Sequence, residues 1–322
     1  RNNLYSLWTN YCVSESYEPG STFKPVTVAS ALEEGVVKDG DTYVCKGFET
    51  VADYKLKCHV FSTIGSHGSL TVEQALMNSC NPYMIHLALE MGNSRFAYYQ
   101  SLFGFGKITG IDLPGETTGI VYGDRMTTID AACNSFGQTI NVNMMQMMAA
   151  YCSIINGGML YQPHIVKRIE SANGEVVKEY KANLVRQTIT ASTSKLLRRY
   201  LKNTVEEGTA KKAGVTGYSV AGKTGTAQKG DRKDNKWIIS FIGHAPAENP
   251  KFAIYVVIDE PYGTTGTSGS SADVLTLTHN ILEKLLPYMN VYKDASDEYE
   301  DTSSSPDELT VDGIPAGTAS SN

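Results

Sequence analysis

The sequence predicts an α+β fold, in which an antiparallel β-sheet is flanked by helices. Three strand-like segments lie close together late in the chain, at residues 219–226, 236–243 and 252–259. Helical segments precede them, and one more follows. Strands that follow one another, without a helix between each pair, favour an antiparallel sheet with helices packed against it. The 322 residues, 41% of them hydrophobic, suffice for one large core or about two domains.

Six segments carry helical signals, several of them with a recognisable start or stop. Residues 21–34 follow a Glu-Pro-Gly turn, and Thr71 is a good N-cap for the second helix. Pro82 is a preferred first helical residue and Gly92 a preferred stop. An Asn-x-x-Gln capping box opens the fourth helix. The expected helices are 21–34, 71–78, 82–92, 143–157, 191–207 and 274–289.

Two further segments are polar. Residues from about 40 to 68 are rich in polar side chains and glycine, which predicts an irregular excursion with a short hairpin. From Asp294 onward the chain has eight acidic residues and no Lys or Arg. We therefore expect residues 1–290 to form the folded domain, and residues 291–322 to be an acidic, serine-rich tail or linker without ordered structure.

The formal net charge of −6 comes from that tail, which leaves the body of the chain close to neutral. No basic stripe or basic amphipathic helix is present, which argues against nucleic acid as a partner. The sequence has no signal peptide and no apolar run of transmembrane length. Because it opens with Arg1 rather than Met, we expect a fragment, which leaves room for an anchor ahead of it.

Ser21 and Lys24 form the first of three motifs that can carry chemistry. They lie three residues apart at the start of a predicted helix, so their side chains share one face. A serine hydroxyl is a weak nucleophile until a neighbouring base removes its proton. A lysine amine does this only when neutral, so its pKa must fall from about 10.4, through burial or a nearby cation. Alone, this spacing is weak evidence, because Ser and Lys are common and it is more often an ordinary, solvated helix start.

Ser79, Cys80 and Asn81 form the second motif, at the break between two predicted helices. At such a break, side chains are free to leave the helix surface. We expect Ser79 to relay a proton between Lys24 and a leaving group, and Asn81 to hold an amide of the substrate. Taken alone, the same residues fit an ordinary helix-capping turn.

Lys223, Thr224, Gly225 and Thr226 form the third motif, on the first predicted strand. Lys223 offers a cation that anchors a substrate carboxylate and lowers the pKa of nearby amines. Because Gly225 has no side chain, an extended peptide is expected to lie against this edge by strand addition. The backbone N–H groups of Thr226 and Ser21 are expected to form an oxyanion hole.

Together the three motifs are far more specific than each is alone. Ser-x-x-Lys, a Ser-Asp-Asn-like motif and Lys-Thr-Gly are the signature of penicillin-binding proteins and related β-lactamases. Over about residues 1–290 the chain resembles the class B penicillin-binding proteins, which are monofunctional transpeptidases. The matching segments are 17–24, 136–138, 156–158, 221–228, 241–243 and 245–247. Residues 79–82 and the segment with Cys45 and Cys58 look most like the sporulation-specific subgroup.

This resemblance implies a penicillin-binding-protein transpeptidase fold, similar to that of serine β-lactamases, anchored at the extracytoplasmic face of the cell membrane. Ser21 would attack the penultimate D-Ala carbonyl of a peptidoglycan stem peptide and release the terminal D-Ala. An amine of a neighbouring stem would then resolve the acyl-enzyme into a crosslink. β-Lactams would acylate Ser21 as mimics of D-Ala-D-Ala. Catalysis would need no cofactor, and the implied partners are stem peptides, β-lactam antibiotics and a glycan polymerase.

Other functions use the same motifs. A D,D-carboxypeptidase shares all three, although the flanking segments favour class B. A β-lactamase needs a deacylating base, and no class A-type glutamate motif is visible. A non-catalytic β-lactam sensor or scaffold is the alternative from another class. A scaffold would normally have lost Ser21, Lys24 or Lys223, and all three are present.

Cys45, Cys58, His59 and His67 lie close together in the sequence, with Asp53 among them. Besides unlinked thiols, two interpretations stay open. A Cys45–Cys58 disulfide suits an extracellular loop. A structural zinc site would use Cys45, Cys58 and His67, with His59 or Asp53 as the fourth ligand.

Overall fold

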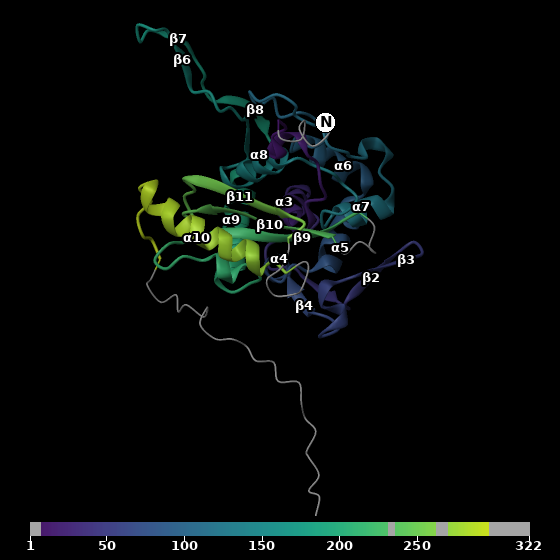
Figure 1. The fold of residues 1–322 in the computed structure, drawn as a ribbon. Coiled ribbons are helices and arrows are strands. Elements are labelled where there is room, and N and C mark those ends of the chain that lie inside the picture. Colours follow the sequence, from purple (N-terminus) through teal and green to yellow (C-terminus); the bar gives the residue numbers. More distant parts are fainter. Residues whose placement is uncertain (1–7, 231–235, 262–269, 296–322) are drawn as a thin grey trace, which may run out of the picture.

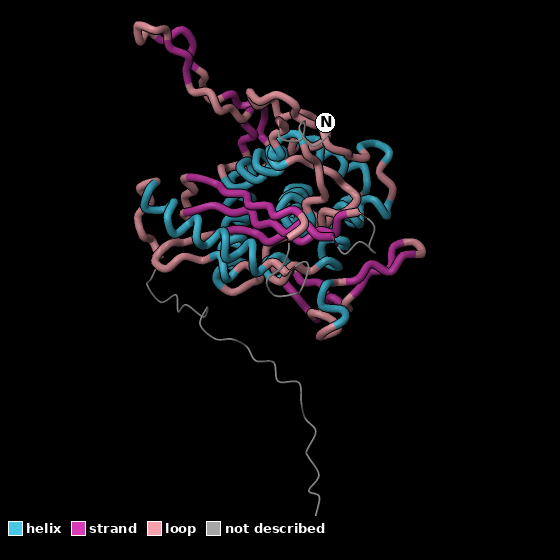
Figure 2. The backbone as a smooth tube through the Cα atoms, viewed as in Figure 1, coloured by secondary structure: helices cyan, strands magenta, loops and turns pink. Residues whose placement is uncertain are grey.

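The computed structural model describes residues 8–230, 236–261 and 270–295. Its centre is an antiparallel sheet in the strand order β11-β10-β9, with helices on both faces (Figures 1 and 2). The strands are β9 (Ala221–Lys229), β10 (Lys236–Ala245) and β11 (Phe252–Asp259). The predicted α+β fold is therefore confirmed.

The helices include every one that the sequence predicts. They are α2 (Tyr11–Ser14), α3 (Lys24–Glu34), α4 (Val72–Met77), α5 (Asn81–Met91), α6 (Asn93–Leu102), α7 (Thr128–Asn134), α8 (Met144–Ile155), α9 (Ala191–Glu206) and α10 (Ala272–Tyr288). Short 3₁₀ helices in the described ranges are η1 (Gly20–Phe23), η2 (His59–Ser62), η3 (Gly123–Arg125) and η4 (Lys211–Ala213).

The middle strand of the sheet, β10, is buried on both faces. Its side chains alternate, as in any strand. Ile239 and Phe241 share a core cluster with Leu282 of α10, on one face. Ile242, on the opposite face, belongs to the larger core that α3, α5, α8 and α9 contribute to. The sheet is thus fixed between two helical layers, which makes its edge strand β9 a firm support for the motif that it carries.

Further strand pairs lie outside this sheet, and the sequence predicted only one short hairpin. They are β1 (Thr42–Cys45) with β4 (Gly68–Thr71), β2 (Phe48–Val51) with β3 (Tyr54–Lys57), β5 (Met159–Gln162) with β8 (Asn183–Gln187), and β6 (Arg168–Glu170) with β7 (Val176–Glu179). The excursion at residues 40–68 is therefore more regular than expected. Figure 1 shows β6 and β7 as an arm that extends away from the body.

Three α-helices were not predicted: the one-turn helix α2, and α6 and α7. The apolar residues of α6 are spread around the helix, so they form no stripe that sequence periodicity would detect. Helix α7 has only seven residues, and a capping box of Thr127 and Asp130 starts it. The N-cap at Thr71 and the capping box at Asn143 formed as the sequence indicates, and Gln74 completes a capping box at Thr71 as well.

The close approach of η1 to β9 depends on glycine. Gly20 has φ +56°, and a Cβ there would lie 2.6 Å from the carbonyl oxygen of Thr226. A Cβ on Gly225 would lie 2.5 Å from Ser240 Oγ and 2.8 Å from Thr22 Cγ2. Our expectation that Gly225 makes room for a bound peptide is therefore corrected. The missing side chain makes room for η1, and so brings the start of α3 against β9.

The chain still packs on the body just beyond residue 290. Val291 is buried, and the Asp294 carboxylate accepts the backbone N–H of Ser219 at 2.7 Å. Residues 296–322, which make up most of the predicted tail, lie outside the described residues. Among the helices that the structure describes, none combines the length and the apolar character that a membrane span requires.

Candidate active site

The three motifs meet at one cleft, as the sequence predicts. The cleft has a volume of about 360 Å³, and its lining includes Ser21, Ser79, Asn81, Thr224 and Thr226. These residues come from η1, from the α4–α5 turn and from β9. The two lysines of the motifs lie behind this lining, and both are fully buried.

Lys24, Ser79 and Ser21 form a continuous chain of polar contacts. Lys24 Nζ lies 3.0 Å from Ser79 Oγ, which in turn lies 3.0 Å from Ser21 Oγ. No hydrogen bond joins Lys24 directly to Ser21 among the described residues, although their spacing suggested a direct contact. The structure places Ser79 between the amine and the nucleophile instead.

Two more oxygen atoms contact Lys24 Nζ and determine whether it can accept a proton. Its Nζ lies 2.6 Å from the carbonyl oxygen of Ser79 and 2.7 Å from Asn81 Oδ1, and both oxygens can only accept hydrogen bonds. A neutral amine has two N–H groups and one lone pair. Because the two N–H groups bind these oxygens, the lone pair is left for the hydroxyl of Ser79. A neutral Lys24 is thus arranged to accept a proton through Ser79.

Burial also makes the neutral amine accessible near physiological pH. It lowers the pKa of Lys24 from 10.5 to about 8, because removal of water penalises the ammonium form. Burial lowers the pKa of Lys223 as well, and the charge of Lys24 lowers it further. The sequence-based requirement concerned Lys24, and there burial lowers the pKa.

The turn between α4 and α5 has a strained backbone at Ser79. Ser79 has φ +54°, in the left-handed region that glycine usually occupies at helix C-termini. Its N–H binds the carbonyl of Leu76, and the N–H of Cys80 binds the carbonyl of Ala75, which is the Schellman pattern. A serine at this position points its hydroxyl into the cleft at a cost in backbone strain, which is a feature typical of functional sites.

Lys223 is bound within its own strand. Its Nζ donates to the carbonyl oxygen of Thr224 at 3.1 Å and to Thr224 Oγ1 at 3.3 Å. The hydroxyl of Thr224 also lies 3.4 Å from that of Thr209, a residue of the cleft that sequence reasoning missed. Thr224 thus connects the buried lysine to the open cleft, where the carboxylate was expected.

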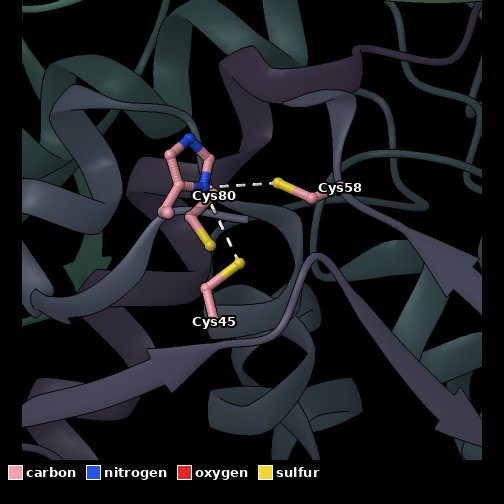
Figure 3. A group of neighbouring side chains, drawn as sticks. Cys45, Cys58 and Cys80 are labelled. Carbon is pink, nitrogen blue, oxygen red and sulfur yellow. Dashed lines mark hydrogen bonds between the residues drawn. The ribbon is translucent and has the colours of Figure 1, made fainter. Parts of the chain in front are cut away.

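The cysteine–histidine segment forms a compact cluster next to this site. The Sγ atoms of Cys45, Cys58 and Cys80 and one ring nitrogen of His67 all lie within 4.8 Å of one another. Figure 3 shows the three labelled cysteine side chains converging. His67 Nδ1 lies 3.5 Å from Cys58 Sγ and 3.7 Å from Cys45 Sγ.

This arrangement corrects the expected ligand set. The fourth member is Cys80, rather than His59 or Asp53. His59 Nε2 lies 2.9 Å from the carbonyl oxygen of Asn78, and the side chain borders the catalytic cleft. Cys80 was missed because it lies outside the 45–67 segment, 13 residues beyond His67, in the motif that follows the next helix. The cysteines are all free, so the Cys45–Cys58 disulfide is not present in this structure.

Comparisons with known proteins agree with the motif set. The penicillin binding protein transpeptidase domain family matches residues 1–283. The chain is 41% identical over 288 residues to stage V sporulation protein D of Bacillus subtilis, covering 88% of this chain and 44% of that protein. It is 32% identical over 292 residues to peptidoglycan D,D-transpeptidase FtsI of Escherichia coli K12, covering 89% of this chain and 46% of that protein.

A solved structure shares the fold. Penicillin binding protein 3 of Mycobacterium tuberculosis, complexed with ampicillin, superposes with a TM-score of 0.80 and 28% identity, covering 90% of this chain and 66% of that one. The chain spans less than half the length of the two curated relatives described above.

Proposed function

This chain belongs to the penicillin-binding protein transpeptidase family, and we propose that it is the catalytic domain of a peptidoglycan D,D-transpeptidase with Ser21 as nucleophile. The observation that supports this most strongly is the chain of contacts from Lys24 through Ser79 to Ser21, in a cleft beside the edge strand β9. The domain comprises residues 1–290, and the contacts of Asp294 extend it to about residue 295.

Acylation begins with proton transfer. The Ser21 hydroxyl gives its proton to Ser79 Oγ while the proton of Ser79 moves to Lys24 Nζ, so the two hydroxyls act as one relay. Ser21 Oγ attacks the penultimate D-Ala carbonyl of a stem peptide. The backbone N–H groups of Ser21 and Thr226 stabilise the oxyanion. As the C–N bond breaks, the proton returns through Ser79 to the departing amine of the terminal D-Ala.

The remaining motif residues bind the substrate. Asn81 Oδ1 is engaged by Lys24, and Asn81 Nδ2 donates to the carbonyl of Lys57 at 3.2 Å, which leaves one N–H for a substrate amide. The hydroxyl of Thr224 binds the terminal carboxylate, with the charge of Lys223 behind it. Gly225 lets η1 approach β9, and the β9 edge beyond it aligns the peptide backbone.

Deacylation distinguishes transpeptidation from hydrolysis. In a transpeptidase, the amine of a neighbouring stem attacks the ester on Ser21, and the relay takes up its proton. In a D,D-carboxypeptidase, water does so. β-Lactams acylate Ser21 as analogues of D-Ala-D-Ala. The M. tuberculosis relative has been solved in complex with ampicillin and with aztreonam.

A direct assay tests this proposal. The protein is incubated with a peptide ending in D-Ala-D-Ala, with and without an amine acceptor, and the products are identified by mass spectrometry. We expect release of D-Ala and an aminolysis product that exceeds the hydrolysis product. Hydrolysis alone, at saturating acceptor, would identify a carboxypeptidase. A β-lactam adduct without peptide turnover would identify a sensor or scaffold.

We also propose that Cys45, Cys58, His67 and Cys80 bind a structural zinc ion. The donor set of three thiolates and one imidazole is a common structural zinc site. With Zn–S of about 2.3 Å and Zn–N of about 2.0–2.1 Å, tetrahedral ligands lie about 3.5 Å apart for a sulfur–nitrogen pair. The two sulfur distances from His67 Nδ1, 3.5 and 3.7 Å, fit this value. Through Cys80, the zinc site would be linked directly to Ser79 and Asn81, the residues on either side of Cys80 in the sequence.

Loss of one ligand provides the test. We expect one zinc per chain in the wild type, and Cys80→Ser to lose the metal and lower the melting temperature by about 10 °C, since a tightly bound metal stabilises the folded state. Cys12→Ser, outside the cluster, is the control and should keep its zinc. A metal-free wild type in which mass spectrometry finds Cys45 and Cys58 bridged would contradict the zinc site.

The cellular setting follows from the substrate. Stem peptides lie outside the cytoplasm, so we propose that the domain works at the extracytoplasmic face of the cell membrane, held by an anchor and paired with a glycan polymerase. Its similarity to a stage V sporulation protein favours a role in sporulation. The chain covers 44% of that protein, so these features of the whole protein stay part of the proposal.

A further inference from the structure

We propose that His59 binds the amine of the acceptor stem in the second half of the reaction. The inference rests on the proposed transpeptidase function and adds to it a residue that acts after Ser21 has been acylated. His59 lines the catalytic cleft together with Ser21 and Ser79, and it is exposed to solvent. It belongs to none of the three motifs, and it is not a member of the cysteine cluster.

The segment that carries His59 is held alongside the second motif at two points. The carbonyl oxygen of Lys57 accepts an N–H of Asn81 Nδ2 at 3.2 Å. Two residues further on, His59 Nε2 lies 2.9 Å from the carbonyl oxygen of Asn78. The two segments therefore run side by side in opposite directions. As a result, the imidazole is fixed to the residue directly before Ser79, whose hydroxyl relays protons to and from the nucleophile.

The contact with Asn78 also determines which nitrogen of His59 is available. A carbonyl oxygen can only accept a hydrogen bond, so Nε2 carries the proton. In the neutral imidazole, Nδ1 then has a lone pair and accepts hydrogen bonds. Nδ1 has no hydrogen-bond partner among the residues that the structure describes. His59 thus brings to the cleft an unused acceptor nitrogen, in a tautomer that the backbone fixes.

The chemistry of the acceptor calls for such a nitrogen. When a neutral primary amine attacks the ester carbonyl, a C–N bond forms and the nitrogen carries two protons. One proton passes through the relay to Ser21 Oγ as the C–O bond breaks. The other proton stays on the nitrogen of the new amide, and its N–H can donate to His59 Nδ1 throughout. His59 therefore neither gains nor loses a proton, and its hydrogen bond orients the amine toward the ester.

The position of His59 also suits the path of the acceptor. The attacking amine takes the place of the departed terminal D-Ala amine, because the same relay exchanges protons with both. That place lies beside Ser79 Oγ, which is 3.0 Å from Ser21 Oγ. The donor lies along β9, whereas His59 begins η2 and is bound to the α4–α5 turn. Water is always at hand, but the acceptor has to be captured from solution, so this hydrogen bond favours aminolysis over hydrolysis.

The fate of a single acyl-enzyme tests the inference. The protein is incubated at pH 8 with a peptide ending in D-Ala-D-Ala and with glycinamide, a small primary amine, and the aminolysis and hydrolysis products are quantified by mass spectrometry. Both products arise from the same acyl-enzyme, so their ratio does not depend on the rate of acylation. We expect His59→Phe to lower the ratio of aminolysis to hydrolysis about five-fold, as for loss of one hydrogen bond. His59→Gln keeps a donor and an acceptor and should stay within about two-fold of the wild type.

His164→Phe is the matched control and should keep the wild-type ratio. His164 is also exposed, and its Nδ1 donates to a backbone carbonyl, that of Val166 at 3.0 Å, on the loop between β5 and β6. An unchanged ratio in His59→Phe, with normal labelling by a fluorescent penicillin, would overturn the role of His59 and leave the proposed function intact. Loss of labelling in His59→Phe would overturn it as well, because the residue would then be needed before the acceptor arrives. A wild type that forms only the hydrolysis product would remove the proposed transpeptidase function, and this inference with it.

Discussion

Replacing Ser21 with alanine is expected to abolish acylation of this protein by β-lactams. The residue supplies the oxygen that forms the ester, and the neighbouring hydroxyl of Ser79, 3.0 Å away, is committed to Lys24. Loss of a nucleophile typically lowers turnover by more than about 10⁴-fold. Labelling with a fluorescent penicillin, followed by intact mass measurement, should give one adduct for the wild type and none for Ser21→Ala.

Ser101→Ala, an exposed position on α6, is the control for this experiment and should be labelled like the wild type. The alanine at position 21 removes a single oxygen from a half-buried residue, so the variant should also keep its melting temperature within a degree or two. Equal labelling of Ser21→Ala and wild type would place the nucleophile elsewhere and end the proposed mechanism.

Replacing Lys24 has the second largest expected effect. Lys24→Met removes the proton acceptor of the relay, and general-base catalysis typically contributes 10²- to 10⁴-fold, so acylation should slow by about that factor. Lys24→Arg tests whether the positive charge alone suffices. A guanidinium keeps the charge but does not lose its proton near neutral pH, so it cannot act as the base. Both variants should be slow if the neutral amine is the active form. Lys195→Met, exposed on α9, should match the wild type.

The pH dependence of acylation tests the same residue without mutation. Burial lowers the pKa of Lys24 to about 8, and the neutral amine is the form that accepts the proton. The rate constant for acylation should therefore rise about ten-fold per pH unit below pH 8 and level off above it. In Lys24→Met this rise should disappear. A wild-type rate that is flat between pH 6 and 9 would show that the ionisation of Lys24 does not control the reaction.

Much of the site was predictable because its motifs are local. Ser21 and Lys24 are three residues apart, and residues 223–226 are contiguous, so helix and strand geometry fix each motif internally. The helix caps at Thr71 and Asn143 are equally local, and both formed. The family also followed from the order of the motifs, because their combination is rare.

Contacts between segments were decided only by the tertiary structure. Ser79 reaches Ser21 across 58 residues, and it lies between Ser21 and Lys24 because the Schellman turn after α4 holds it at φ +54°. The same turn carries Cys80 into the cluster in place of His59. Spacing along the chain limits which neighbours a residue meets within its own element. Which other element a residue faces depends on how the helices pack on the sheet. The energy of that packing is distributed over the whole core, so no short segment of sequence reveals it.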